Sequence, residues 1–192
     1  NGKFEATTGD QVNNWNTYGK GYAVAPNEGR NGSTAIMLEN FSDSEQSGLY
    51  TAIGFYQTVP RTVAVSGWSK AENVSGDVDG GNGLYMDIRF TDGTYQYAKT
   101  VSFSVGTHDW ENRTVFLNTT KPISEVYLYS YLTGHTGKVW FDDLSVWEVT
   151  DGAELQDMAV TPLVEPPQTT YTTLETADGL SLSLGENGVS SL

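Results

Sequence analysis

Tyrosines alternate with other residues along one short segment, Val126-Tyr-Leu-Tyr-Ser-Tyr-Leu132. Successive side chains of a β-strand point to opposite faces of a sheet, so Tyr127, Tyr129 and Tyr131 would share one face. Flat aromatic rings stack on the apolar C–H faces of sugar rings, and phenol hydroxyls bond to sugar hydroxyls. The segment therefore predicts a ligand-binding face, because a surface that only meets water does not need such a row.

A second alternating segment, Leu84-Tyr-Met-Asp-Ile-Arg-Phe90, has an apolar face that must belong to the core. Its other face carries Tyr85, Asp87 and Arg89. The strand that ends at Trp68 likewise places this indole on its non-core side. We predict that these side chains and the tyrosine row form one cleft, in which the charged groups bond to the rim of a sugar.

Two other interpretations of this face stay open. Tyrosine is a good strand former, so the row can also serve cross-strand packing or lie under a neighbouring domain in a structural interdomain role. A hydrolase on the same fold would need two carboxylates set apart across a cleft, and a polysaccharide lyase would need a Tyr/His or Lys/Arg pair. Asp87 is the only convincing acid of the face, and His135, in a Gly-rich turn expected to be solvated, is the candidate partner. We therefore favour a non-catalytic domain.

Charge and composition exclude several classes of function. The 192 residues include 10 basic and 24 acidic side chains, a net charge of −14, so nucleic acids and anionic membrane surfaces would be repelled. The absence of Cys and the presence of only two His exclude disulfide frameworks, thiol nucleophiles and Cys/His zinc sites. A hard cation held by carboxylate and carbonyl oxygens remains compatible with the composition.

Short segments of period two, separated by Gly- and Asn-rich turns, predict an all-β fold. The predicted strands are 62–68, 84–90, 101–105, 114–117, 126–132 and 139–146. No stretch has the pattern of a long amphipathic helix. Strands of this length and spacing are typical of a two-sheet antiparallel β-sandwich or jelly roll.

Composition changes sharply near residue 150, which predicts three regions. All ten basic residues and 22 of the 23 aromatic residues precede it. We assign 1–150 to the sandwich and 151–178, acidic and Pro-containing, to a linker. Residues 179–192, which include the alternating Leu180-Ser-Leu-Ser-Leu184, are the start of a following β-domain or a tail that folds back.

An ordered series of motifs resembles a known family over residues 1–149. The motifs are Asn1-Gly-Lys-Phe-Glu5, Gly29-Arg-Asn-Gly-Ser-Thr34, Val65-Ser-Gly-Trp-Ser-Lys-Ala71, Thr107-His-Asp-Trp110 and Trp140-Phe-Asp-Asp-Leu-Ser-Val146. They resemble the jelly-roll, galactose-binding-domain-like carbohydrate-binding modules of families 4, 16 and 22. The resemblance implies a monomeric, non-catalytic domain that binds plant, algal or microbial polysaccharide. It also implies a catalytic domain in the same parent chain and a secreted, extracellular location, in bacteria, which fits a chain that begins without Met.

The resemblance also implies a structural Ca²⁺ near the Gly-rich turn. Glu5 and either Asp142 or Asp143 would supply carboxylates, and Arg30 a backbone carbonyl, with Lys3 as a source of another. Oxygen ligands suit this ion, and joining the two ends of the domain would stabilise it.

For the ligand cleft, the resemblance to family 22 points to Trp68, Tyr95 or Tyr97, and Tyr129. This sequence departs from the pattern at Tyr131, where the family has an acid, so xylan specificity does not follow. The two charged residues of the 84–90 face would replace the missing contact.

Overall fold

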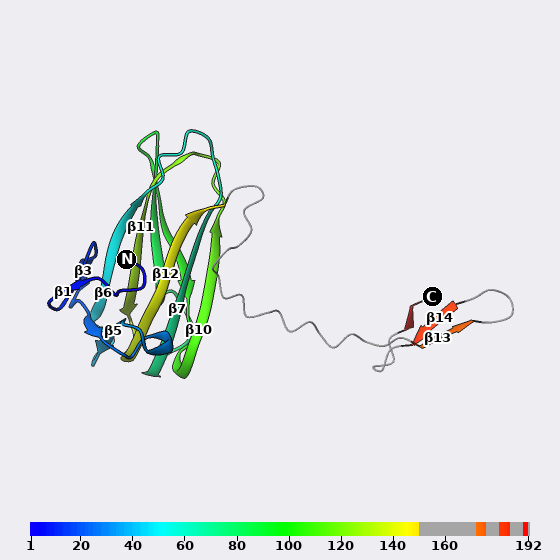
Figure 1. The fold of residues 1–192 in the computed structure, drawn as a ribbon, viewed down its shortest axis with the longest axis horizontal. Helices are drawn as coiled ribbons and strands as arrows, with labels where there is room; N and C mark the ends of the chain where they lie inside the picture. Colours follow the sequence, from blue (N-terminus) through cyan, green and yellow to red (C-terminus); the bar gives the residue numbers. More distant parts are fainter. Residues whose placement is uncertain (150–171, 176–180, 185–189, 192) are drawn as a thin grey trace. The chain divides into compact units, whose positions relative to one another are not determined.

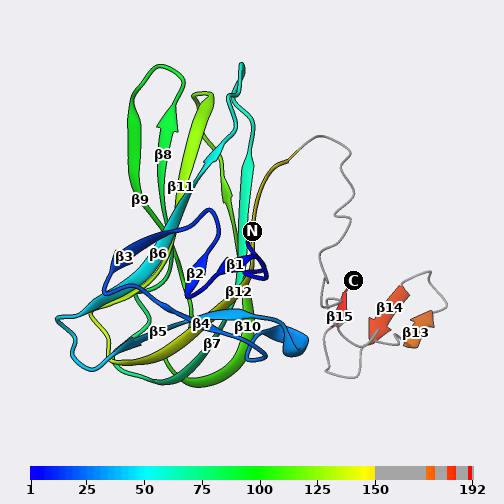
Figure 2. The ribbon, with the colours of Figure 1, turned by 60° about the vertical axis from the view of Figure 1, so that its left-hand side comes forward.

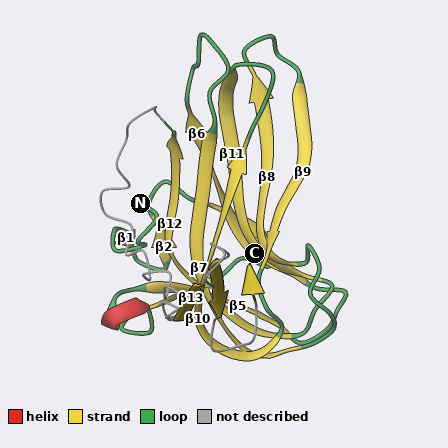
Figure 3. Cartoon of the chain, turned by 90° about the vertical axis from the view of Figure 1, so that its right-hand side faces the viewer, coloured by secondary structure: helices red, strands yellow, loops and turns green. Residues whose placement is uncertain are grey.

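The computed structural model describes residues 1–149 and three short strands, 172–175, 181–184 and 190–191. Contacts between residues divide the chain into two compact units, Asn1–Gly152 and Ala153–Leu192. The first unit consists almost entirely of strands and loops (Figure 3). Within the described residues, no helix is long and apolar enough to cross a membrane.

Two five-stranded antiparallel sheets pack face to face in the first unit (Figures 1 and 2). The first, here called the tyrosine sheet, has the order β3 (Asn16–Gly19), β6 (Gln46–Gly54), β11 (Ile123–Thr133), β8 (Asn82–Phe90) and β9 (Tyr95–Ser102). The second, called the tryptophan sheet, has the order β10 (Gly106–Leu117), β7 (Val63–Val74), β12 (Gly137–Glu148), β5 (Ala35–Asn40) and β4 (Ala23–Ala25). A small hairpin of β1 (Thr7–Thr8) and β2 (Gln11–Val12) and one 3-10 turn, η1 (Arg30–Gly32), complete the unit. The predicted two-sheet β-sandwich is confirmed.

The core lies between the sheets, and the predicted strand faces are confirmed. The predicted core residues of β8 and β11 are buried: Leu84, Met86, Ile88, Phe90, Val126, Leu128 and Leu132. Residues between them on the same strands face outward, because side chains alternate across a strand. The same alternation that builds the core therefore sends the tyrosines to the opposite face.

One predicted strand was placed wrongly. The alternating residues 101–105 were expected to form a strand, but β9 ends at Ser102. Phe103 is fully buried and packs edge-on against Phe141 of the other sheet, with ring centroids 5.7 Å apart. The alternation of apolar residues here reflects the burial of a connecting loop. A pattern of apolar residues does not by itself distinguish a buried loop from a paired strand.

The second unit contains three paired strands, β13 (Thr172–Glu175), β14 (Ser181–Leu184) and β15 (Ser190–Ser191). Strand β13 lies inside the range 151–178 that was predicted as linker, in a short Thr-rich stretch that favours strand. Residues 150–171, the rest of the predicted linker, lie outside the described residues.

Glycines on both neighbouring strands make room for one tyrosine of the outer face. Tyr131 on β11 pairs with Gly48 on β6 and with Gly83 on β8. A Cβ atom added to Gly48 would lie 2.6 Å from the Ser130 carbonyl oxygen and 3.0 Å from Tyr131 Cβ. Any larger residue at this position would force the paired backbones apart.

We therefore expect Gly48→Ala to lower the free energy of unfolding by roughly 1–3 kcal/mol, measured by urea denaturation. Ala52→Ser, an exposed change on the same strand, is the control and should stay within about 0.5 kcal/mol of the parent. Equal stability of Gly48→Ala and the parent would show that β6 and β11 do not approach this closely.

Candidate functional site

The outer face of the tyrosine sheet carries aromatic rings from all five of its strands. Tyr129 on β11 is paired in register with Tyr50 on β6 and with Tyr85 on β8, so three rings lie side by side across three strands. Tyr50 and Tyr129 are stacked, with centroids 5.0 Å apart, and Tyr85 meets Tyr129 edge-on at 5.5 Å. Antiparallel register alone produces this row.

A groove of about 330 Å³ opens beside the row. It is lined by Tyr18, Tyr85, Asp87, Tyr129 and Tyr131, and is here called the tyrosine groove. Four of these five residues were predicted from sequence, and Tyr18 on β3 was missed. Strand β3 has only four residues, so its alternation is too short to give a signal. For Tyr50 a signal existed, because apolar residues alternate with it along β6.

The phenols of this face are held in their neutral form. Burial raises the pKa of Tyr131 to about 12, and its hydroxyl donates a hydrogen bond to the Gly80 carbonyl. Burial also raises the pKa values of Tyr85, Tyr127 and Tyr129. Neutral phenols can both donate and accept hydrogen bonds, as contacts to sugar hydroxyls require.

Asp87 is the single carboxylate of the groove. Its Oδ1 accepts a hydrogen bond of 3.3 Å from the Ala98 backbone N–H. None of the ion pairs among residues 1–149 includes Asp87. After burial, hydrogen bonding to Asp87 and then the negative charge of Asp87 contribute to the raised pKa of Tyr85. The groove thus offers a carboxylate that no cation of the domain neutralises.

The other predicted residues of the tyrosine sheet extend the face beyond the groove. Arg89 forms an ion pair of 3.0 Å with Glu125, which also accepts a hydrogen bond from the Tyr127 hydroxyl. The hydrogen bond to Glu125 raises the pKa of Arg89. Tyr95 and Tyr97 on the edge strand stack on each other with centroids 5.5 Å apart, and both are exposed. None of these residues lines the tyrosine groove.

Trp68 does not lie in the predicted cleft, and that prediction was wrong. It is on β7, which belongs to the tryptophan sheet. The guanidinium of Arg30 covers its ring at 3.6 Å from the centroid and forms an ion pair with Asp143. Alternation assigns a side chain to a face of its own strand, but it does not reveal which sheet the strand joins.

The tryptophan sheet has its own aromatic cluster, and the protein's cations already occupy it. Lys70 Nζ lies 4.6 Å from the Trp140 ring centroid and 5.3 Å from that of Trp110. Trp140 Nε1 donates a hydrogen bond of 2.7 Å to Glu28. Among residues 1–149, none of the cation–π contacts involves a ring of the tyrosine groove. The tyrosine groove therefore differs from this cluster in presenting rings that no cation covers.

The residues predicted to hold Ca²⁺ lie around the turn that contains η1. Asp142 is fully buried, and its Oδ2 accepts hydrogen bonds from the Arg30 backbone N–H (2.8 Å) and Ser33 Oγ (2.7 Å). Ser33 Oγ also lies 2.6 Å from the Arg30 carbonyl oxygen. One hydroxyl proton cannot serve both oxygens, so this cluster has an excess of acceptors. Burial raises the pKa of Asp142. This donor set fits a hard cation.

The remaining predicted ligands are less closely grouped. Glu5 accepts hydrogen bonds from the backbone N–H (2.8 Å) and Oγ1 (3.2 Å) of Thr34, the residue after this cluster. The Asp143 side chain is engaged by Arg30, and Lys3 is exposed. Within the described part of the chain, no three His, Asp or Glu side chains form a metal-binding group, so an ion here would rely on backbone carbonyls.

His135 is buried, which corrects the prediction of a solvated turn residue. It is 2% exposed, with Nε2 2.9 Å from Asp79 Oδ1 and Nδ1 2.5 Å from the Ser75 carbonyl oxygen. The hydrogen bond to His135 lowers the pKa of Asp79. His135 therefore fastens the loop that carries Gly80, but it does not line the tyrosine groove. The acid–base pair of Asp87 with His135 that a lyase or hydrolase would need is not formed.

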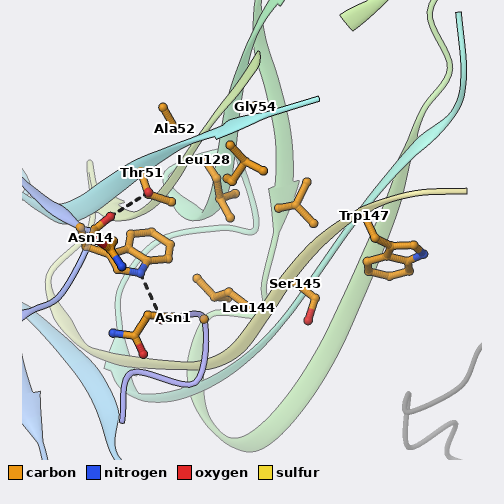
Figure 4. Close-up of a pocket in the computed structure, with 13 residues that line it drawn as sticks. Asn1, Asn14, Thr51, Ala52, Gly54, Leu128, Leu144, Ser145 and Trp147 are labelled. Carbon is orange, nitrogen blue, oxygen red and sulfur yellow. Dashed lines mark hydrogen bonds between the residues drawn. The ribbon is translucent and has the colours of Figure 1, made fainter. Parts of the chain in front are cut away.

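A second hollow, of about 590 Å³, opens between the sheets near the N-terminus (Figure 4). Polar groups that line it are hydrogen-bonded to one another. Trp15 Nε1 donates a hydrogen bond to the Asn1 carbonyl, and Thr51 Oγ1 donates one to the Asn14 carbonyl. No Asp, Glu, Lys, Arg or His side chain lines it. It lacks both the row of rings and the carboxylate of the tyrosine groove.

No protein-family model and no curated protein sequence matches the chain. Among solved structures, it is similar to the CBM22-1 xylan-binding domain of Xyn10C from Paenibacillus barcinonensis, with 15% identity and a TM-score of 0.55. That match covers 77% of this chain and 92% of the other. The first unit has the fold of a family 22 module. A second match, the CBM22-1 and GH10 modules of endo-1,4-β-D-xylanase 10B from Clostridium thermocellum with xylohexaose, has 20% identity and a TM-score of 0.51. It covers 73% of this chain, which spans only 27% of the other.

The same fold also occurs within an enzyme chain. An arabinose-bound α-L-arabinofuranosidase matches with 14% identity and a TM-score of 0.54, over 78% of this chain and 26% of the other. This fold is found in solved structures of both carbohydrate-binding modules and a glycosidase chain. The fold alone therefore does not assign a function, which must be inferred from the residues of the site.

The raised pKa of Tyr131 predicts a loss of stability at alkaline pH. Above pH 10, the ordinary tyrosine pKa, the unfolded chain releases this proton, whereas the folded protein keeps it until about pH 12. Stability should therefore fall as pH rises through this window, measured by urea denaturation. Tyr131→Phe should reduce the slope, and Tyr56→Phe, at an exposed tyrosine, is the control. Parallel slopes in all three proteins would contradict the assignment.

Proposed function

We propose that residues 1–149 form a non-catalytic carbohydrate-binding domain that holds a polysaccharide chain in the tyrosine groove. The observation that carries this proposal is the contrast between the two sheets. On the tryptophan sheet, cations of the protein cover the rings of Trp68, Trp110 and Trp140, whereas the groove presents rings that no cation covers, beside a carboxylate without an ion pair. The family 22 modules of similar fold, one of them complexed with xylohexaose, support the same proposal.

Recognition of a sugar would combine stacking on aromatic rings with hydrogen bonding to polar groups. The rings of Tyr85 and Tyr129 provide apolar surface for the C–H faces of a sugar, and Asp87 accepts hydrogen bonds from its hydroxyls. Each such bond replaces one to water and adds little net free energy, so a single domain binds weakly. A catalytic domain in the same secreted parent chain would gain from this weak binding, because tethering raises its effective concentration on the substrate. The domain would act as a monomer.

An enzyme in the tyrosine groove is disfavoured because the groove has a single carboxylate. Glycoside hydrolysis requires a pair of acids flanking the scissile bond, and the groove supplies only Asp87. His135 is committed to Ser75 and Asp79.

We also propose that Ca²⁺ binds at the turn beside Asp142. This buried carboxylate would act with the Arg30 carbonyl and Ser33, and with Glu5, which accepts a hydrogen bond from the backbone N–H of the residue after Ser33. The ion would neutralise a carboxylate that the domain buries without a cation of its own. Because it would join the N-terminal segment to β12, its contribution is to stability and not to sugar binding.

The groove assignment predicts that Tyr129→Ala weakens retention by the polysaccharide that the domain binds at least about tenfold in affinity electrophoresis. Xylan, β-glucans, mannan, agar and alginate form the test panel. Tyr56→Ala, the loss of an exposed ring outside the groove, is the matched control, and Trp68→Ala should also retain binding. Thermal melting verifies that each variant is folded. Loss of retention in Trp68→Ala with normal retention in Tyr129→Ala would place the ligand on the tryptophan sheet instead. New reducing ends in the same samples would overturn the non-catalytic assignment.

The calcium proposal predicts a chelator-sensitive melting temperature. Ca²⁺ at about 100 times its dissociation constant would add about 2.7 kcal/mol to the free energy of unfolding. The Ca²⁺-dependent part of the melting shift should be lost in Asp142→Asn and reduced in Glu5→Gln, while Asp109→Asn, on β10, should keep it. Identical melting of the parent protein with Ca²⁺ and with chelator would refute the site.

A further inference from the structure

We propose that the tyrosine groove selects a sugar that carries a positively charged amino group, and that the ammonium lies against Asp87 among the tyrosine rings. The groove would thus recognise an amino-sugar polymer of the glucosamine type in preference to neutral or anionic glycans. This inference rests on the proposed carbohydrate binding and specifies its ligand class.

The rings of the groove form walls that stand at right angles. Tyr85 makes interplanar angles of 83° with Tyr129 and 87° with Tyr131. Tyr18 makes angles of 81° and 77° with the same two rings. These rings pack edge to face, so the groove they line has aromatic surfaces in two orientations, and a compact group that enters it meets rings from more than one direction. Aromatic faces attract cations through their quadrupole, and such cages are used to bind ammonium groups.

The charges of the groove also favour a cationic ligand. Asp87 is its only ionisable group besides the phenols, and no Lys, Arg or His lines it. The nearest cation along the strand, Arg89, is paired with Glu125 outside the groove. The whole chain carries a net charge of −14. An ammonium would form a charge-assisted hydrogen bond with Asp87, while a uronate or sulfate would be repelled.

The hydroxyl of Tyr131 adds a third observation. Its proton is donated to the Gly80 carbonyl, so this hydroxyl can only accept a hydrogen bond from a ligand. Tyr18 likewise donates its hydroxyl to Gln46, at 3.2 Å. Two of the four rings therefore contribute aromatic faces with fewer free polar groups, which suits a cation more than a ring of sugar hydroxyls.

Three trimers with the same β-1,4 backbone test the proposal: glucosamine, N-acetylglucosamine and glucose. We expect the glucosamine trimer to bind roughly tenfold more tightly than the other two at a pH where its amine is protonated, measured by NMR titration. This preference should disappear when the pH is raised until the amine is neutral. Short ligands limit the non-specific attraction that a long polycation would have for an acidic protein.

Asp87→Asn should lower the affinity for the glucosamine trimer to that for the glucose trimer, so that the preference is lost. Asp109→Asn removes the same charge from the other sheet and should keep the preference, which separates local contact from long-range attraction. Equal loss in both variants, or equal affinity for the three trimers, overturns the amino-sugar assignment but leaves carbohydrate binding intact. If neither the trimers nor any polysaccharide of the panel binds, the proposed function itself fails.

Discussion

The antiparallel register of β11 between β6 and β8 is the constraint on which the site depends. It places Tyr129 beside Tyr50 and Tyr85, and Tyr131 between two glycines. The opposite faces of the same strands form the core. A slip of one residue would exchange the two faces and bury the phenols. The register that buries the aliphatic side chains also sets the positions of the rings. The hydrophobic stabilisation of the core therefore maintains the geometry of the groove.

Both sheets carry aromatic residues, yet only one set is open to a ligand. On the tryptophan sheet, Arg30 covers the ring of Trp68 and forms an ion pair with Asp143, and Lys70 lies over the ring of Trp140. Arg30 thereby contacts a ring and a carboxylate at once, which stabilises the turn near η1. The groove has no such partner among the described residues. Exposed aromatic residues thus have two roles in one domain, and the position of the cations separates them.

The sequence predicts local features of this domain better than long-range ones. Alternation correctly identified the outward faces of β8 and β11, because a side chain's face depends only on its own strand. It placed Trp68 wrongly, because the sheet that a strand joins is decided by pairing with distant segments. Burial of His135 likewise depends on its hydrogen bonds to Ser75 and Asp79, which lie 60 and 56 residues away along the chain. Tyr18 was missed because its strand is too short to establish a period.

Two carboxylates without cationic partners illustrate how burial determines what an acid can do. Asp142 is fully buried, so its charge must be balanced permanently by hydrogen bonds, a proton or an ion. Asp87 is only partly buried and stays hydrated until a ligand covers it. A neutral sugar that covers Asp87 displaces water from the carboxylate and replaces it with hydrogen bonds alone. An ammonium group also provides the electrostatic attraction between opposite charges. Selectivity of the groove would therefore arise from the desolvation of one carboxylate, while the rings contribute affinity to every sugar that stacks on them.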